Sequence, residues 1–154
     1  MKKYRSLLIL LFSLSATVAA AADLKDVFED AQRHFRRGDY EGAVEAWTRV
    51  IDAQPSDTNA GSDQIDLSLV YFNRGFSYKR LHLWKEAADD FSMVLGFDPN
   101  DARALYERGG CYNMLGLDDK AAADIAKACR LDDAYCDEKM LEEKREQKEK
   151  ESLY

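Results

Sequence analysis

Apolar and small residues recur along this chain at helical spacing, in pairs of segments separated by short breaks. Within residues 27–35 the apolar positions fall at i, i+4, i+7 and i+8, and residues 44–51 have a similar stripe. Such spacing predicts amphipathic helices. The short breaks predict that the two helices of each pair are antiparallel. The expected helices cover 24–37, 40–53, 65–81, 84–97, 101–115 and 118–131, with a last helix from about residue 134.

The helical pair is repeated three times. One unit recurs after 44 residues and again after a further 34, so the basic period is 34 and the first interval holds ten extra residues, 58–67, expected to form a loop. Stacking three such units buries a continuous core that a single pair cannot bury. The matched positions, unit by unit, are Ala31, Ala43, Trp47, Val50 and Pro55; Gly75, Ala87, Phe91, Val94 and Pro99; and Gly109, Ala121, Ile125, Ala128 and Asp133.

The segments "GDYEGAVEAW" (38–47) and "LWKEAADDF" (83–91) make residues 24–133 resemble the tetratricopeptide repeat family. The third unit departs most, with Asp118 for the turn aromatic and Asp133 for the proline. The resemblance implies an all-α fold, a right-handed superhelical stack of three helix-turn-helix repeats. The expected organisation is a repeat domain over 23–133, with repeats at 24–57, 68–101 and 102–135, followed by a capping helix and charged tail over 134–154.

The first 22 residues have the layout of a secretory signal peptide. A basic start is followed by an apolar run over 7–14 and an alanine-rich end. We expect cleavage after Ala22, with Ala20 as the second choice and an uncleaved anchor as the alternative. After cleavage no membrane insertion is expected. The protein would then work outside the cytoplasm, in the periplasm or as a secreted protein.

Net charge limits the possible partners. The full chain has a formal charge of −7, and removing Lys2, Lys3 and Arg5 leaves 19 basic against 29 acidic residues, a net charge of −10. Binding to nucleic acid phosphates requires a basic footprint. The composition therefore argues against a nucleic acid partner.

The chain contains three cysteines: Cys111, Cys129 and Cys136. An exported chain permits a disulfide. Cys111 and Cys129 lie on the two helices of the last repeat. They are expected to be about 9 Å apart along the helix axis, at about 1.5 Å per residue, which is too far for a bridge. Cys129 and Cys136 flank one turn, where a bridge is feasible, and both a bridge and two free thiols remain open. The segment "KACRLDDAYC" (127–136) is also similar to the Sel1-like repeats.

No catalytic or metal-binding motif is visible. The sequence lacks HExxH, GxSxG, a glycine-rich phosphate loop and CxxC. His34 shares the repeat position of Tyr78 and Tyr112, which predicts a packed side chain. The many acidic pairs are expected to be solvated surface, so we expect a protein that is not an enzyme and needs no cofactor or metal. A hydrolase using paired acids is the alternative that an activity screen would test.

The resemblance places the first helix of each repeat along a concave groove, where five cations and two anions accompany five aromatic rings. A basic, aromatic groove suits an extended peptide or a helix that carries carboxylates and apolar anchors. We expect a non-enzymatic protein-binding or scaffolding module of the periplasm or cell envelope. The alternative is an assembly module that self-associates through its charged tail or repeat edges; the sequence does not set the oligomeric state. The predicted contact residues are Phe72, Phe76, Lys79, Arg80, Arg103 and Tyr106.

The family resemblance also raises a carboxylate clamp, which the sequence supports poorly. Asn73 occupies a position at which some family members hold the C-terminal carboxylate of a peptide. The first repeat has Phe28 and Gln32 at the related positions, and Glu107 contradicts the clamp in the third.

Overall fold

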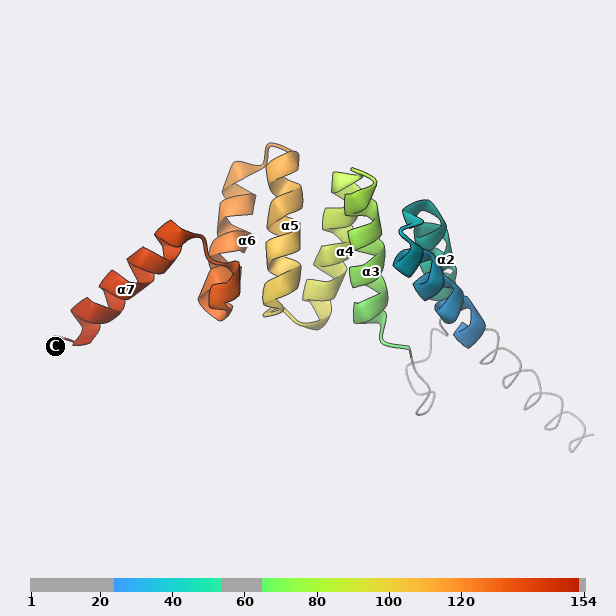
Figure 1. Ribbon diagram of the computed structural model, residues 1–154, viewed down its shortest axis with the longest axis horizontal. Helices are drawn as coiled ribbons and strands as arrows, with labels where there is room; N and C mark the ends of the chain where they lie inside the picture. Colours follow the sequence, from blue (N-terminus) through green and yellow to red (C-terminus); the bar gives the residue numbers. More distant parts are fainter. Residues whose placement is uncertain (1–23, 54–64, 153–154) are drawn as a thin grey trace, which may run out of the picture. The chain divides into compact units, whose positions relative to one another are not determined.

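The computed structural model of the protein describes residues 24–53 and 65–152 (Figure 1). The predicted signal peptide and most of the predicted insertion lie outside the described residues. The chain divides into two units, residues 1–64 and 65–154, and each is described by itself. Every regular element in the described ranges is helical, which confirms the all-α prediction.

The first unit contains one antiparallel helical hairpin. Residues 24–37 are helical and are followed by α2 (Tyr40–Asp52). Asp39 begins α2 because its carboxylate accepts a hydrogen bond from the Gly42 backbone N–H at 3.0 Å. The two helices bury Ala31 and Trp47, and the Phe28 ring meets Trp47 edge-on at 5.3 Å.

The second unit contains two further hairpins that pack side by side (Figure 1). Its elements are α3 (Leu67–Arg80), α4 (Trp84–Phe97), α5 (Ala102–Met114), α6 (Asp118–Leu131), the 3-10 turn η1 (Asp133–Tyr135) and α7 (Glu138–Ser152). Helix α4 packs against both α3 and α5, and α5 packs in turn against α6. The core contains Phe91 at the position equivalent to Trp47, and Phe72 meets it edge-on at 5.4 Å. An equivalent aromatic contact therefore lies between the two helices within each of the first two hairpins.

The turn inside each hairpin requires one residue in the left-handed region. Gly38, His82 and Gly116 occupy the same repeat position and have φ of 75°, 61° and 70°. Glycine takes this conformation at little steric cost, whereas a residue with a Cβ does not. The second hairpin therefore accommodates His82 where the other two have glycine.

Glycines let the paired helices approach closely in the second and third hairpins. A Cβ on Gly75 would lie 3.0 Å from Asp90 Cβ, and one on Gly109 would lie 2.8 Å from Ile125 Cγ1. Both distances are shorter than ordinary packing allows. These short distances confirm the prediction that small residues at this position let the two helices of a hairpin approach closely.

A bidentate ion pair joins the two helices of the second hairpin, and its equivalent joins those of the third. Arg74 donates to Asp90 at 2.8 and 2.7 Å, and Arg108 donates to Asp124 at 2.7 and 2.9 Å. Burial raises the pKa of the Asp90 carboxyl, and the hydrogen bonds from Arg74 oppose that rise. Arg108 also donates to Ser92 Oγ at 3.0 Å, which links the third hairpin to the second.

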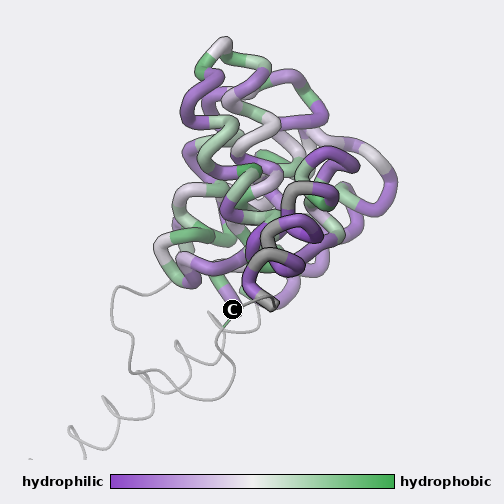
Figure 2. The backbone as a smooth tube through the Cα atoms, turned by 90° about the vertical axis from the view of Figure 1, so that its left-hand side faces the viewer, coloured by the Kyte–Doolittle hydropathy of each residue, from purple (hydrophilic) through white to green (hydrophobic). Residues whose placement is uncertain are grey.

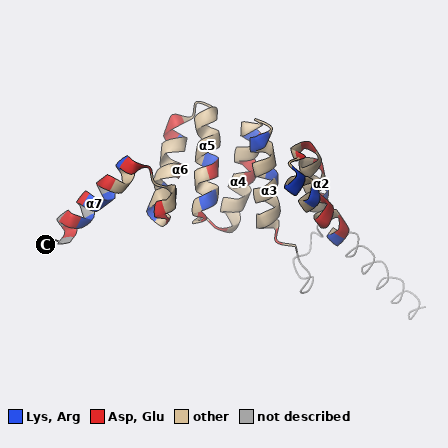
Figure 3. Cartoon of the chain, in the orientation of Figure 1, with Lys and Arg blue, Asp and Glu red and all other residues tan. Residues whose placement is uncertain are grey.

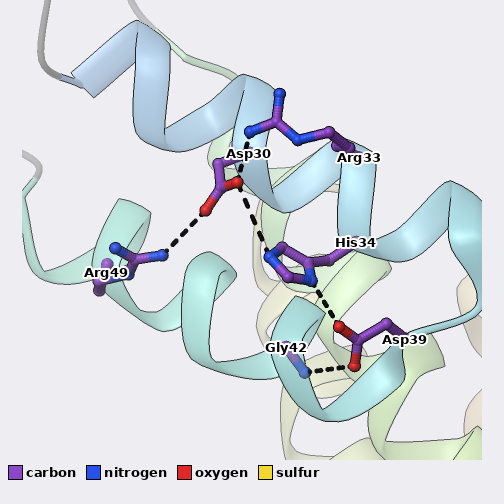
Figure 4. A network of polar contacts seen from close by, with 6 residues as sticks. All are labelled: Asp30, Arg33, His34, Asp39, Gly42 and Arg49. Carbon is purple, nitrogen blue, oxygen red and sulfur yellow. Dashed lines mark hydrogen bonds and ion pairs between the residues drawn. The ribbon is translucent and has the colours of Figure 1, made fainter.

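The first hairpin reverses this polarity, with the acid on its first helix (Figure 4). Asp30 accepts from Arg33 at 2.5 Å and from Arg49 of α2 at 3.1 Å. His34, predicted to pack, is instead 34% exposed, and its Nδ1 lies 2.6 Å from Asp39 Oδ2. Asp39 attracts the imidazole to the hairpin surface, an effect that hydrophobic spacing does not reveal.

The end of the chain differs from the prediction. A last helix was expected from about residue 134, but η1 intervenes and α7 begins at Glu138. The Asp132 side chain accepts from Ala134 N–H at 2.9 Å, which favours a turn in place of a continuous helix. Helix α7 is mostly hydrophilic (Figure 2) and has opposite charges interspersed along its length (Figure 3). Within residues 24–53 and 65–152, no helix has the length and hydropathy needed to cross a membrane.

Candidate functional site

The predicted contact residues lie on α3 and α5, and two contacts join these helices directly. Lys79 Nζ lies 2.5 Å from Glu107 Oε2, and the Arg103 guanidinium stands 4.3 Å above the Phe72 ring. We call the surface formed by Phe76, Lys79, Arg80, Arg103 and Tyr106 the α3–α5 face. Asp66 and Asp101 begin the two helices by accepting backbone N–H groups with their carboxylates.

Phe72 belongs to the core and is excluded from the α3–α5 face, which corrects its predicted place among the exposed contact residues. Only 8% of its surface is accessible, because it packs against Phe91 below and is covered by Arg103 above. Phe76 is partly buried and packs against the same core. Phe72 therefore supports the face from beneath, whereas Phe76 belongs to the face and also packs on the core.

The Lys79–Glu107 pair leaves the counted charge of the groove unchanged, because the sequence count already included Glu107. Glu107, the third-repeat residue that argues against a carboxylate clamp, is here the partner of Lys79 in the second repeat. Nearby, burial raises the pKa of the Cys111 thiol to about 11. A thiol with that pKa stays protonated at neutral pH and is a poor nucleophile.

Arg103 and Tyr106 are the exposed pair on this face. They are three residues apart on α5, so they lie on the same side of the helix. Tyr106 is 43% exposed, and within the described part of the chain Arg103 contacts the Phe72 ring and pairs with no carboxylate. The pair offers a cation beside an aromatic ring. Arg80, at the end of α3, is also exposed.

The structure adds Tyr135, which the sequence analysis did not select for the face. Cys129 and Cys136 form a disulfide, and Tyr135, just before Cys136, lies 5.2 Å from Tyr106 between ring centroids. No hydrophobic periodicity marks Tyr135, because it lies in a turn. The available signal was a lone aromatic residue next to a cysteine that could close that turn.

The described residues contain no group of three or more histidine, cysteine, aspartate or glutamate side chains placed to hold a metal ion. The chemistry of the α3–α5 face consists of ion pairs, ring contacts and an exposed guanidinium. This arrangement can recognise a ligand by charge and by apolar contact.

Comparison with known proteins shows what the hairpins are similar to. Residues 72–135 match the tetratricopeptide repeat family model. The matched segment extends from Phe72 on α3 through η1, and so includes most of the two hairpins of the second unit. Solved structures of tetratricopeptide repeat domains have the same helical fold. One is the second such domain of human RPAP3 in complex with the HSP70 peptide SGPTIEEVD, with a TM-score of 0.59 and 24% identity, covering 81% of this chain and 92% of that one.

Two further proteins resemble the chain. PcrH, in complex with the chaperone-binding region of PopB, has a TM-score of 0.59 and 18% identity, covering 73% of this chain and 83% of that one. The mitochondrial import receptor subunit TOM70 of Rattus norvegicus is 29% identical over 109 residues, which is 71% of this chain. The alignment spans only 17% of that receptor. The likeness therefore concerns a small part of that receptor's length.

Proposed function

We propose that this chain is a non-enzymatic protein-binding module whose α3–α5 face holds a peptide or helix of a partner protein. The observation that carries the proposal is the exposed pair on α5, with the Arg103 guanidinium beside a half-exposed Tyr106. Proteins of the same fold are solved with bound partners, an HSP70 peptide in one case and the chaperone-binding region of PopB in another. The chemistry of the face suits a segment with a carboxylate for Arg103 and an apolar side chain for Tyr106.

The proposal places this module outside the cytoplasm. Residues 1–22 would act as a signal peptide, and the three repeats of the mature protein would work in the periplasm or cell envelope. The support is the basic, apolar and alanine-rich order of the N-terminal sequence. Determining the N-terminal residue of the protein purified from the producing cell tests this directly, and an N-terminus at Met1 would contradict it.

The binding test compares two matched double variants in a crosslinking pull-down from an envelope extract. Arg103→Glu with Tyr106→Ala changes the α3–α5 face. Arg130→Glu with Leu131→Ala makes the same kind of change on α6, where Leu131 is 45% exposed. The first variant is expected to lose most of the partner captured by the wild type, and the second to keep it.

Circular dichroism must show that both double variants remain folded. Equal capture by the two variants would refute the assignment of binding to this face. Phe76 is a poorer test residue, since it packs on the core and its truncation would change stability as well as binding.

A second candidate function is self-association through α7. The observation in its favour is the run of interspersed charges along that helix (Figure 3), which can pair with a second copy. Light scattering on the mature chain, with and without residues 142–154, separates the two functions. A dimer that becomes a monomer on truncation, while pull-down is unaffected by the Arg103 variant, would favour this second function.

A further inference from the structure

The disulfide fixes the turn that follows the last hairpin. Cys129 lies in the final turn of α6, Cys136 comes directly after η1, and their Cα atoms are 4.6 Å apart. Helix α7 contributes a second attachment, because Lys144 Nζ donates to the Cys129 carbonyl oxygen at 3.0 Å and also pairs with Asp133. The turn is thus held from both sides.

This turn presents one aromatic side chain to the α3–α5 face. Tyr135 is partly buried against the core, and its ring lies 5.2 Å from that of Tyr106 at an angle of 38°. Aromatic pairs at this separation attract each other beyond their buried area. Tyr135 therefore extends the exposed pair on α5 into a surface of one cation and two rings.

The preceding repeat explains why this surface is open. Phe72 and Tyr106 occupy the same repeat position, and α5, the first helix of the next hairpin, supplies Arg103 to cover Phe72. In the described part of the chain no further hairpin follows α6. Tyr135 of η1 is the residue that contacts Tyr106, in the way that Arg103 contacts Phe72. The cover is less complete, since Phe72 is 8% exposed and Tyr106 is 43% exposed.

We propose that the Cys129–Cys136 disulfide controls partner binding by holding Tyr135 against Tyr106. This inference rests on the proposed function of the α3–α5 face. The ligand is a peptide segment whose carboxylate meets Arg103 and whose apolar side chain packs on the Tyr106–Tyr135 pair. The oxidised chain is the binding form.

Reduction reverses this state. A dithiol reductant gives two electrons and two protons to the disulfide, its own two sulfurs become a disulfide, and Cys129 and Cys136 become thiols. The turn then keeps only its noncovalent contacts, among them those of Lys144 and the packing of Tyr135 on the core, and Tyr135 is held less firmly against Tyr106. Losing one aromatic contact corresponds to about threefold to tenfold weaker binding.

The test uses fluorescence polarisation with an array of 12-residue peptides in which glutamate, phenylalanine and leucine positions vary. The oxidised full-length mature chain is compared with the Cys129→Ser/Cys136→Ser double variant and with Tyr135→Ala, both expected to bind about threefold to tenfold more weakly. Tyr135→Phe keeps the ring and is expected to bind like the wild type. Adding dithiothreitol should weaken binding by the wild type and leave the double variant unchanged, which controls for the buried thiol of Cys111.

A second readout needs no ligand. Hydrogen exchange followed by mass spectrometry should show faster exchange over residues 132–141 in the double variant. Unchanged exchange there would overturn the inference, and so would equal peptide binding by wild type and double variant. If no peptide of the array binds the oxidised wild type, the proposed function itself fails for this class of ligand, and the inference fails with it.

Discussion

Two adjacent glycines of α5 allow the packing of the third hairpin to be tested against an internal control. Gly109 faces α6, and a Cβ added there would lie 2.8 Å from Ile125 Cγ1 and 3.2 Å from the Ala121 carbonyl oxygen. A Cβ added to Gly110 would meet nothing within 4 Å. Both residues are interior to the same helix, so Gly109→Ala and Gly110→Ala differ mainly in the space that the new methyl group meets.

The expected magnitudes follow from these distances. Replacing glycine by alanine inside a helix stabilises it by about 1 kcal/mol, and Gly110→Ala should show that gain in full. Overpacking a close contact costs about 1–3 kcal/mol, and the backbone oxygen of Ala121 cannot rotate away. Gly109→Ala should therefore leave the protein unchanged or up to about 2 kcal/mol less stable, with the two variants separated by about 1–3 kcal/mol.

Urea unfolding of the chain from residue 23, followed by far-ultraviolet circular dichroism, measures the two free energies of unfolding. Gly75→Ala is a third point on the same scale, since its nearest contact, Asp90 Cβ at 3.0 Å, is slightly longer. It should be less damaging than Gly109→Ala. Equal stabilisation by Gly109→Ala and Gly110→Ala would refute the close approach of α5 and α6.

Two further predictions concern local conformation and charge. His82→Gly is expected to raise the free energy of unfolding by about 1 kcal/mol, because glycine adopts positive φ without the steric cost; a thermal unfolding midpoint below that of the wild type would contradict this. The Gly42 N–H and then His34 lower the pKa of Asp39 below 3.8, so the stability from its charge is present above pH 3.8 and lost as pH falls through the folded pKa. Asp39→Asn should therefore destabilise the first hairpin at neutral pH and have little effect in acid. Trp47 fluorescence during unfolding, in a Trp84→Phe background, checks this, and an equal effect at both pH values would count against it.

The hydrophobic pattern alone predicts most helix positions. The predicted spans 84–97 and 118–131 coincide with α4 and α6, and the other helices before residue 131 agree within about two residues at each end. Because the unit occurs three times, each helix can be compared with its equivalents in the other units. The predicted helix boundaries are reliable for this reason. After residue 131 that comparison ends, and the start of α7 was predicted four residues too early.

The details of the candidate face depend on how neighbouring repeats interlock, which periodicity does not encode. Phe72 was predicted to face the groove because the sequence pattern did not place it against its partner helix, yet it packs on Phe91 of α4 and Arg103 of the next repeat covers it. The sequence placed both Lys79 and Glu107 on the groove. To predict that they pair, one would also need the relative height of α3 and α5, which the pattern does not give. The sequence analysis did not select the Arg74–Asp90 and Arg108–Asp124 pairs, although arginine recurs at 74 and 108 and aspartate at 90 and 124, each after one period of 34.

The reversed polarity of the first hairpin has a consequence for assembly. Asp30 occupies the repeat position that holds Arg74 in the second hairpin. If residues 24–37 exchanged partners and packed on α4, Asp30 would meet Asp90, and two carboxylates would share a site without a cation. Arrays of similar hairpins are prone to such domain swapping, and this arrangement of charge disfavours it between the first hairpin and its successors.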